Sequence, residues 1–184
     1  MEDSILMNPI IDHEKRERPV MLPDGTLVRL RPIRSDDGPA LVALFGRLSE
    51  CTIYQRFFTV RRSLPAEWVH LFTQVDYDRR MAIVAERDTK NGPEVAGVVR
   101  YDVSEPADTA EIAIVVEDAW QRHGLGTILL HAIMRAGEAR GIRTFRVALV
   151  RPRSGAGRPG YCAVQPPSMT SSLPVTNRAS SEAR

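Results

Sequence analysis

The sequence predicts an α/β fold in which one β-sheet is flanked by helices, and three observations support this. Segments with alternating or continuous apolar residues recur along the chain, as half-buried and buried strands require. Other segments place leucines and aromatic residues three or four positions apart, which is the spacing of one helix face. A strand, a turn, a helix and a second strand follow one another over residues 110–150, an order that brings two strands into one sheet.

The first part of the chain is predicted to contain one strand and two helices. Residues 1–20 are polar without periodicity and are expected to form a flexible arm, so the domain is predicted over residues 21–150. Residues 27–32 alternate as a strand does. Ser35-Asp36-Asp37 is expected to cap a helix through a side-chain oxygen, and the following leucines form its apolar stripe. Ser63 is expected to cap the second helix, which carries a proline in its first turn.

Three strands are predicted next. Residues 81–85 and 95–101 are rich in β-branched residues, and Asn91-Gly92 between them is a hairpin dipeptide. Because the intervening segment is slightly long, we expect a loose hairpin. Residues 110–116 form a further strand rich in isoleucine and valine.

The last predicted elements are a helix and a strand. Residues 125–140 place apolar residues on one helix face, and Gly141 stands where a left-handed cap ends a helix. Residues 144–150 are predicted to form the final strand. Residues 151–184 are dominated by Pro, Gly, Ser, Thr and Arg without a period, and we expect them to be disordered.

Composition excludes several classes of function. No apolar run approaches the roughly 20 residues that span a bilayer, and residues 1–18 lack the apolar stretch of a secretory signal, so a cytoplasmic location is expected. Cys51 and Cys162 are too few and too far apart for a metal cluster. Residues 151–184 hold five arginines and one glutamate, so the net charge of +2 leaves −2 for residues 1–150. A nucleic-acid surface on the folded part is therefore not expected.

The segment Gln121-Arg122-His123-Gly124-Leu125-Gly126-Thr127 lies between a predicted strand and a predicted helix. Its glycines allow the backbone to approach a ligand closely. The first amides of a helix have no intrahelical partner, and the helix dipole favours an anion beside them. A diphosphate fits this description. On spacing alone, a tight turn without a ligand explains the segment equally well.

The same segment resembles a known signature. Gln121-x-x-Gly124-x-Gly126 is similar to the acetyl-CoA motif of the GNAT superfamily of N-acetyltransferases, and Tyr54-Gln55-Arg56-Phe57-Phe58 and Asp76-Tyr77-Asp78-Arg79 resemble its bacterial protein-lysine acetyltransferases. The resemblance implies the GNAT fold, with a mixed, mostly antiparallel sheet. It also implies acetyl-CoA as co-substrate, no metal, and a primary amine as acceptor, with protein lysine favoured. By position it assigns the contacts with CoA to Val115, Val116, Gln121, Arg122, His123, Gly124, Leu125, Gly126 and Thr127.

The resemblance also places a catalytic glutamate at Glu111, beside apolar neighbours at the start of a strand. The alternative is a solvated charge at a strand end. Glu117 and Asp118 are weaker candidates for the base, because they precede the loop. His123 and His131 are also candidates, although His123 is more simply explained as a donor of its amide.

The resemblance covers residues 26–150 and then stops. Members of the family continue with a helix and two strands, whereas residues 151–184 carry neither, so we expect the fold to be incomplete at its C-terminal end. A frameshift in a longer protein would explain this. The sequence therefore leaves two further functions open besides the enzyme: an inactive remnant or non-catalytic CoA-binding module, and, least favoured, a basic arm for nucleic acid formed by residues 151–184.

Overall fold

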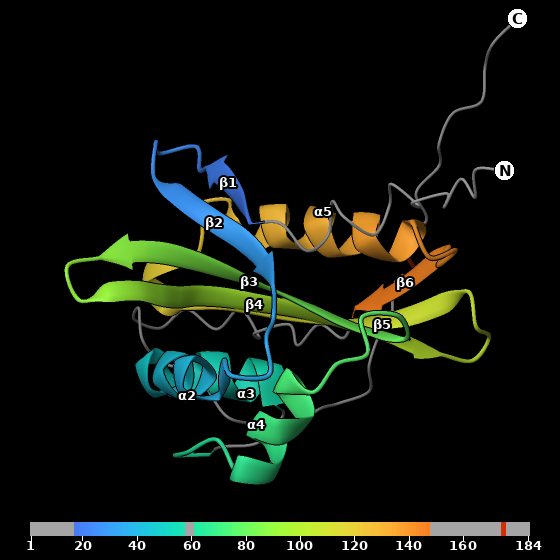
Figure 1. Ribbon diagram of the computed structural model, residues 1–184, viewed down its shortest axis with the longest axis horizontal. Helices are drawn as coiled ribbons and strands as arrows, with labels where there is room; N and C mark the ends of the chain where they lie inside the picture. The colour runs from blue at the N-terminus through green and yellow to red at the C-terminus, as the bar shows by residue number, and fades with distance from the viewer. Residues whose placement is uncertain (1–16, 58–60, 148–173, 176–184) are drawn as a thin grey trace, which may run out of the picture.

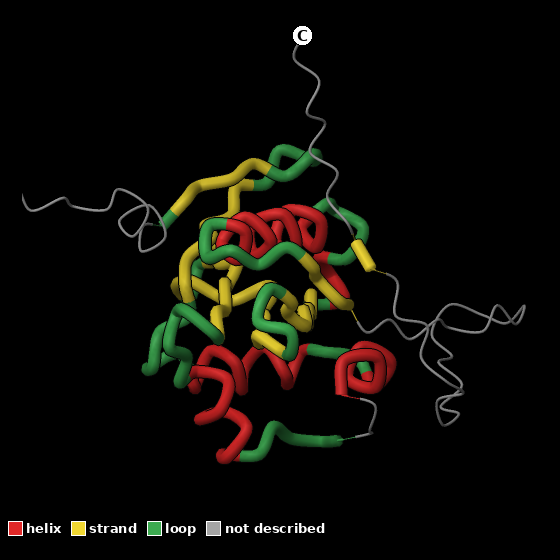
Figure 2. The backbone as a smooth tube through the Cα atoms, turned by 90° about the vertical axis from the view of Figure 1, so that its right-hand side faces the viewer, coloured by secondary structure: helices red, strands yellow, loops and turns green. Residues whose placement is uncertain are grey.

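The structure is a computed structural model that describes residues 17–57, 61–147 and 174–175. In this part of the chain a seven-stranded sheet has its strands in the order of the sequence. Helix α5 covers one face of the sheet, and α2, α3 and α4 cover the other (Figure 1). The view along the layers shows the same arrangement (Figure 2). The predicted α/β class is confirmed, and all strand pairs but one are antiparallel.

The sheet begins with two short strands, β1 (Arg18–Met21) and β2 (Leu27–Pro32), which pair antiparallel. The turn between them is closed by a hydrogen bond of 2.8 Å from the Leu22 amide to the Thr26 carbonyl. Gly25 supplies the left-handed backbone with φ of 83°. Strand structure therefore begins at Arg18, inside the segment that the sequence assigned to the flexible arm; residues 1–16 lie outside the described part.

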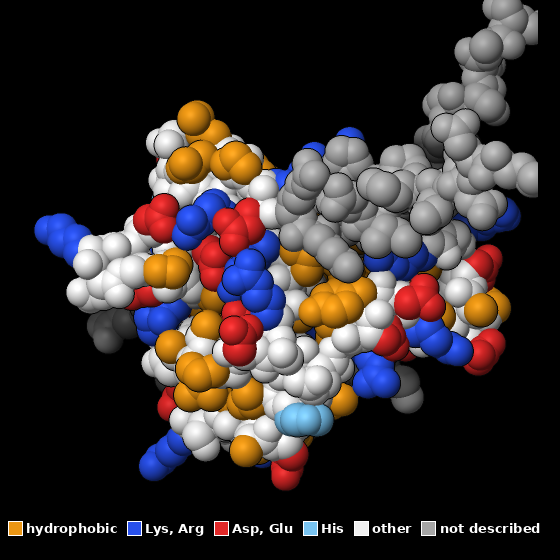
Figure 3. All heavy atoms as spheres, viewed as in Figure 1, with side chains coloured by type: hydrophobic (Ala, Val, Ile, Leu, Met, Phe, Trp, Pro, Cys, Tyr) orange, Lys and Arg blue, Asp and Glu red, His pale blue; other side chains and the backbone are white. Residues whose placement is uncertain are grey.

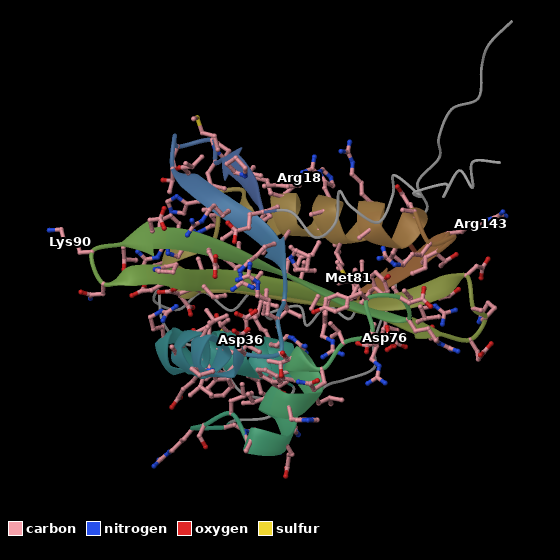
Figure 4. The ribbon with its side chains drawn as sticks, viewed as in Figure 1. Arg18, Asp36, Asp76, Met81, Lys90 and Arg143 are labelled. Carbon is pink, nitrogen blue, oxygen red and sulfur yellow. The ribbon has the colours of Figure 1, made fainter. Side chains whose placement is uncertain are left out.

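Strands β3 (Arg80–Thr89) and β4 (Gly92–Ser104) form the longest hairpin. The expectation of a loose hairpin is wrong, because the ladder has one register shift between Ala85 and Glu86 and then continues to the pair Thr89 and Gly92. Gly92 has φ of 107°, and the Thr89 hydroxyl donates to its carbonyl at 2.7 Å. Lys90 marks this tip, and Arg143 lies beside β6 at the opposite end of the sheet (Figure 4).

Strand β5 (Thr109–Val116) pairs antiparallel with β4, and β6 (Thr144–Val147) pairs parallel with β5. Helix α5 (Leu125–Glu138) connects them, as the sequence predicts. Gly141 adopts the predicted left-handed conformation, with φ of 85°. The predicted end of β6 at residue 150 lies outside the described residues. The two residues of β7 (Pro174–Val175) pair with β6, and the rest of the predicted disordered segment is not described.

Three helices cover the other face: α2 (Gly38–Arg47), α3 (Glu50–Phe57) and α4 (Ala66–Thr73). The sequence analysis missed α3, and α4 begins after Pro65 and not at Ser63. Asp37 precedes α2, but its side chain does not cap the helix. Its carboxylate instead accepts hydrogen bonds from the Arg34 amide and the Arg31 guanidinium, at 2.6 and 2.7 Å.

Two apolar clusters hold the layers to the sheet. One lies between the sheet and α5 and contains Leu125, Leu129 and Ile133, all fully buried. The other lies between the sheet and the α2–α4 layer and contains Leu41 and Leu44. On the face shown in Figure 3, acidic and basic side chains are interspersed over the strands, and hydrophobic side chains gather over the α2–α4 layer.

Candidate active site

The predicted ligand loop lies between β5 and α5. A short 3-10 helix, η1 (Asp118–Trp120), leaves the strand, and residues 121–124 then turn the chain into α5. Two residues of this turn have a left-handed backbone, Arg122 with φ of 65° and Gly124 with φ of 85°. Such a conformation is uncommon for a residue with a side chain. The turn thus leads directly into the first turn of α5.

The backbone amides of this loop are free of partners within the described chain. Residues 121–124 form a turn, but none of the six amides from Arg122 to Thr127 donates a hydrogen bond of normal length and angle to another described residue. Ile128 is the first to join the helix ladder, at 3.1 Å to the Gly124 carbonyl. No side chain caps α5. Unpaired amides at a helix start, together with the positive end of the helix dipole, form a binding site for an anion.

Side chains from other elements hold the loop in this shape. The Gln121 amide group donates to the Val116 carbonyl and to the Thr52 hydroxyl, both at 3.0 Å. Asp118 accepts from the Ser49 amide and hydroxyl and from the Thr52 hydroxyl, at 2.6–2.8 Å. Burial opposes ionisation of Asp118, but these hydrogen bonds outweigh it and lower its pKa. The signature glutamine therefore ties the loop to α3 through its amide nitrogen.

The turn between β1 and β2 also packs against the loop. His123 Nδ1 lies 2.7 Å from the Asp24 carboxylate. A hydrogen bond from the Thr26 amide and the contact with His123 lower the pKa of Asp24 to about 2. A Cβ atom at Gly124 would lie 3.0 Å from Pro23 Cδ, so this position combines a left-handed backbone with close packing. A Cβ atom at Gly126 would meet only ordinary contacts, the nearest at 3.8 Å from Val116.

Val115 and Val116, which are predicted to contact CoA, lie in the part of β5 beyond its described pairing with β6. The described parallel ladder ends at the pair Ile112 and Val147, whereas β5 continues to Val116. The Val115 side chain is buried toward the α2–α4 layer, and Val116 packs with the cluster under α5. The outer edge of β5 beyond Ile112 therefore has no described strand partner, and such an edge can pair with an extended amide-bearing chain.

Glu111 is exposed and accepts no hydrogen bond from the described residues. It lies opposite Asp102 on β4 and Arg146 on β6, so the three charged side chains share one face of the sheet. This face is also the one on which Ala113 and Val115 line a pocket beneath the helices. Glu111 is therefore accessible, and it stands two residues, roughly 7 Å, along the strand from that pocket.

The weaker candidates for the base are engaged elsewhere or lie apart. Glu117 is buried in an ion pair with Arg47 at 3.1 Å, and Asp118 is held by α3. His131 is exposed on α5, on the opposite face of the sheet from Glu111.

The sequence analysis did not identify two arginines of the pocket. Arg56 of α3 and Arg100 of β4 line a space of about 490 Å³, counting its open mouth, between the sheet and the helices. Arg56 lies in the segment 54–58, which resembles bacterial protein-lysine acetyltransferases. The sequence alone could not show that Arg56 and Arg100 line the same pocket.

Two classes of site are absent from the described residues. These residues contain no group of three or more His, Cys, Asp or Glu side chains placed to hold a metal ion. None of their helices has the length and apolarity to cross a bilayer.

Several known proteins are similar to this chain. The profile of the acetyltransferase (GNAT) family matches residues 49–156. The chain is 28% identical to an acetyltransferase of Pseudomonas aeruginosa over 123 residues, which are 66% of this chain and 66% of that protein. It is 28% identical to acetyltransferase Pat of Mycolicibacterium smegmatis over 132 residues, 72% of this chain but 39% of the relative. The chain thus spans less than two thirds of each of these proteins.

Among solved structures, the GNAT domain of PAT from S. lividans superposes with a TM-score of 0.68 and 36% identity. The match covers 74% of this chain and 80% of that domain.

Proposed function

This chain belongs to the GNAT acetyltransferase family, and we propose that it transfers the acetyl group of acetyl-CoA to a primary amine, with Glu111 as the general base. The observation that carries the proposal is the row of six amides from Arg122 to Thr127 that have no partner in the described chain. The first four amides of any helix lack an intrahelical partner, and this loop adds those of Arg122 and His123 to the row. The diphosphate of CoA supplies acceptors in the number and charge that this row requires.

The loop binds the diphosphate without a lysine. Each hydrogen bond to a charged oxygen contributes about 1.5–3 kcal/mol, so several amides suffice for a stable complex. The network of Gln121, Asp118 and Thr52 fixes the amides before the ligand arrives. Such preorganisation reduces the entropy lost on binding. The free edge of β5 near Val115 and Val116 is the proposed path of the pantetheine arm.

The chemistry requires an amine with a free electron pair. A lysine side chain has a pKa near 10.4, and removing its proton at neutral pH costs about 4.6 kcal/mol at ~1.36 kcal/mol per pH unit. Glu111 accepts that proton as the nitrogen attacks the carbonyl carbon, directly or through one water. The nitrogen–carbon bond forms, the carbon–sulfur bond breaks, and CoA leaves as its thiol after taking up a proton. Holding the amine beside the thioester supplies the remaining acceleration.

The favoured acceptor is a protein lysine. Support comes from the resemblance to bacterial protein-lysine acetyltransferases and from the 36% identity with the S. lividans PAT domain. A non-catalytic CoA-binding module is the second candidate, because Glu111 is exposed and lies outside any hydrogen-bond network of the described residues.

Replacing Glu111 with glutamine separates the two candidates. The variant keeps the shape of the side chain but cannot accept a proton, so we expect the rate of acetyl transfer to fall by about 100-fold or more. The affinity for acetyl-CoA, measured by calorimetry, should stay unchanged. Glu105→Gln, an exposed change in the turn after β4, is the control and should leave both values as they are.

If Glu111→Gln transfers acetyl groups at the original rate, Glu111 is not the base. If the unaltered protein binds acetyl-CoA but transfers nothing to any amine offered, the chain is a binding module.

A further inference from the structure

The pocket between the sheet and the α2–α4 layer is apolar apart from two charges. Its described lining includes the leucines at positions 41, 44 and 48 and the valines at 98 and 115. The charged side chains of this lining are Arg56 and Arg100, and no described carboxylate lines the pocket with them. Two cations in an apolar space are costly to bury unless something satisfies them.

Arg100 is only partly satisfied. Its side chain is 9% exposed and forms two hydrogen bonds with Asp102, at 2.9 Å through Nε and 2.7 Å through Nη2. The third nitrogen, Nη1, is buried without a hydrogen-bond partner. Asp102 therefore neutralises part of the charge but leaves one donor free on a side chain that lines the pocket.

Arg56 has no ion pair and no hydrogen bond among the described residues. Its guanidinium stacks on Phe57 and Phe72, 4.9 and 5.8 Å from the ring centres. Burial and the nearby charge of Arg100 lower its pKa to about 10, and it is still protonated at neutral pH. The guanidinium of Arg100 lies over the same Phe72 ring at 5.2 Å, so the two cations share one wall of the pocket.

We propose that this pocket binds a carboxylate group of the acceptor through Arg56, beside the positive charge of Arg100, with the apolar lining holding the stem that carries it. A planar carboxylate accepts hydrogen bonds from guanidinium groups side by side. It would pair with the Arg56 guanidinium and reduce the repulsion between the two arginines. The identity of this ligand as the acceptor rests on the proposed function, whereas the binding of a carboxylate in the pocket does not.

The position of the pocket agrees with such a role. Ala113 and Val115 line it from the part of β5 that has no described partner on its outer edge, and Glu111 follows on the same face. Glu111 is exposed and attracts an ammonium group, whereas Asp102 opposite it is paired with Arg100. A ligand with an amine at one end and a carboxylate at the other would thus meet an acidic group and then basic groups along one face of the sheet.

The test compares two molecules of equal length, 6-aminohexanoate and hexylamine, by calorimetric titration. We expect 6-aminohexanoate to bind at least tenfold more tightly. Arg56→Gln should remove this difference, whereas Arg61→Gln should not. Arg61 is the matched control because it also stacks on an aromatic ring, Trp68 at 4.4 Å, but does not line the pocket. Equal affinity for the two molecules, or an unchanged preference in Arg56→Gln, would overturn the proposal.

A second arm asks where the carboxylate comes from. Lysine peptides with either glutamate or glutamine beside the lysine are tested as ligands of the same variants. A preference for glutamate that Arg56→Gln removes assigns the carboxylate to a peptide; a preference confined to 6-aminohexanoate assigns it to a small amino acid. Indifference in both arms rejects the pocket as a carboxylate site.

Titration with acetyl-CoA keeps this proposal separate from the proposed function. Arg56→Gln should bind acetyl-CoA as the unaltered protein does, because the loop amides lie outside the pocket. If 6-aminohexanoate binds as expected but no acetyl transfer occurs, the proposed function fails and the carboxylate site stands. Thermal melting confirms that each variant folds. If Arg100→Gln folds, it serves as a further variant.

Discussion

At the scale of residues, the most tightly enclosed charges are not in the site. Arg31 is 4% exposed and pairs with Asp37 at 2.7 Å and with Glu86. These contacts join β2, the start of α2 and β3. Because both carboxylates are buried, the arginine is required to satisfy them, although an ion pair of this kind need not stabilise more than apolar packing would.

Replacing Arg31 with alanine should therefore destabilise the protein by about 3–5 kcal/mol, since it leaves two buried carboxylates unpaired. Urea denaturation measures the change. Arg29→Ala is the control: Arg29 pairs with Asp88 at 2.8 Å, but Asp88 is 74% exposed, so the loss should stay below about 1 kcal/mol. Equal losses of unfolding free energy in the two variants would show that the buried ion pairs matter no more for stability than the exposed pair.

The same residues predict a dependence on pH. Burial opposes ionisation of Asp37, but hydrogen bonds from Arg31 and from the Arg34 amide outweigh it and hold the pKa below its ordinary value of 3.8. A carboxyl group with a lowered folded-state pKa contributes stability that is complete above 3.8 and is lost as the pH falls through the folded-state pKa.

Urea denaturation from neutral pH to below 3.8 should thus show falling stability, and Asp37→Asn should make the fall shallower. The comparison with this variant is needed because the pKa of Asp118 is also lowered. If Asp37→Asn leaves the slope unchanged, Asp37 does not titrate in this range.

Asp37 also shows why residue roles are hard to predict from sequence. Its position before an apolar helical stripe is typical of a helix cap, and it does precede α2. The arginine that uses its carboxylate comes from a neighbouring strand, and only the folded chain brings them together. Glu111, in contrast, was predicted to lie on a strand, as it does, and its exposure was the alternative considered for it.

At the scale of elements, the two glycines of the loop have different tasks. Gly124 has φ of 85° and packs against Pro23, whereas Gly126 lies in the first turn of α5 with space for a methyl group. We expect Gly124→Ala to destabilise the protein by about 1–2 kcal/mol from backbone strain, with the clash adding to it. Gly126→Ala should be neutral or stabilising by up to about 1 kcal/mol, because alanine favours the helix.

Urea denaturation of both variants checks this difference. Equal destabilisation would mean that the left-handed turn at Gly124 is not a feature of the protein in solution.

Elements with a strong local pattern could be predicted from the sequence. The strand before the loop and helix α5 have a continuous apolar pattern, and the observed bounds differ by only a residue or two from the predicted ones. Helix α3 was missed because its buried residues, Thr52, Ile53 and Tyr54, are consecutive and give no helical period. The β3–β4 hairpin was predicted, but not its tight turn, because the charged residues Arg87 and Glu94, which pair across it at 2.7 Å, resemble loop residues in the sequence.

At the scale of the whole molecule, the candidate site depends on segments distant in sequence. The turn after β1 supports the loop through Asp24, and α3 supports it through Thr52. The sequence could indicate the loop, because its glycines and the helix lie next to each other. It could not indicate the arginine pocket, whose two cations come from different elements and meet only across the interface between sheet and helices.

The central claim is that the loop amides of residues 122–127 bind the diphosphate of acetyl-CoA. Calorimetric titration of acetyl-CoA into the unaltered protein, Gly126→Gln and Gly126→Glu tests it most directly. The two variants have side chains of the same size, but the glutamate carboxylate competes for the amides and repels the diphosphate. We expect the unaltered protein to bind and Gly126→Glu to bind at least about tenfold more weakly than Gly126→Gln, a difference of ~1.4 kcal/mol. No binding by the unaltered protein, or equal affinity in the two variants, would contradict the claim.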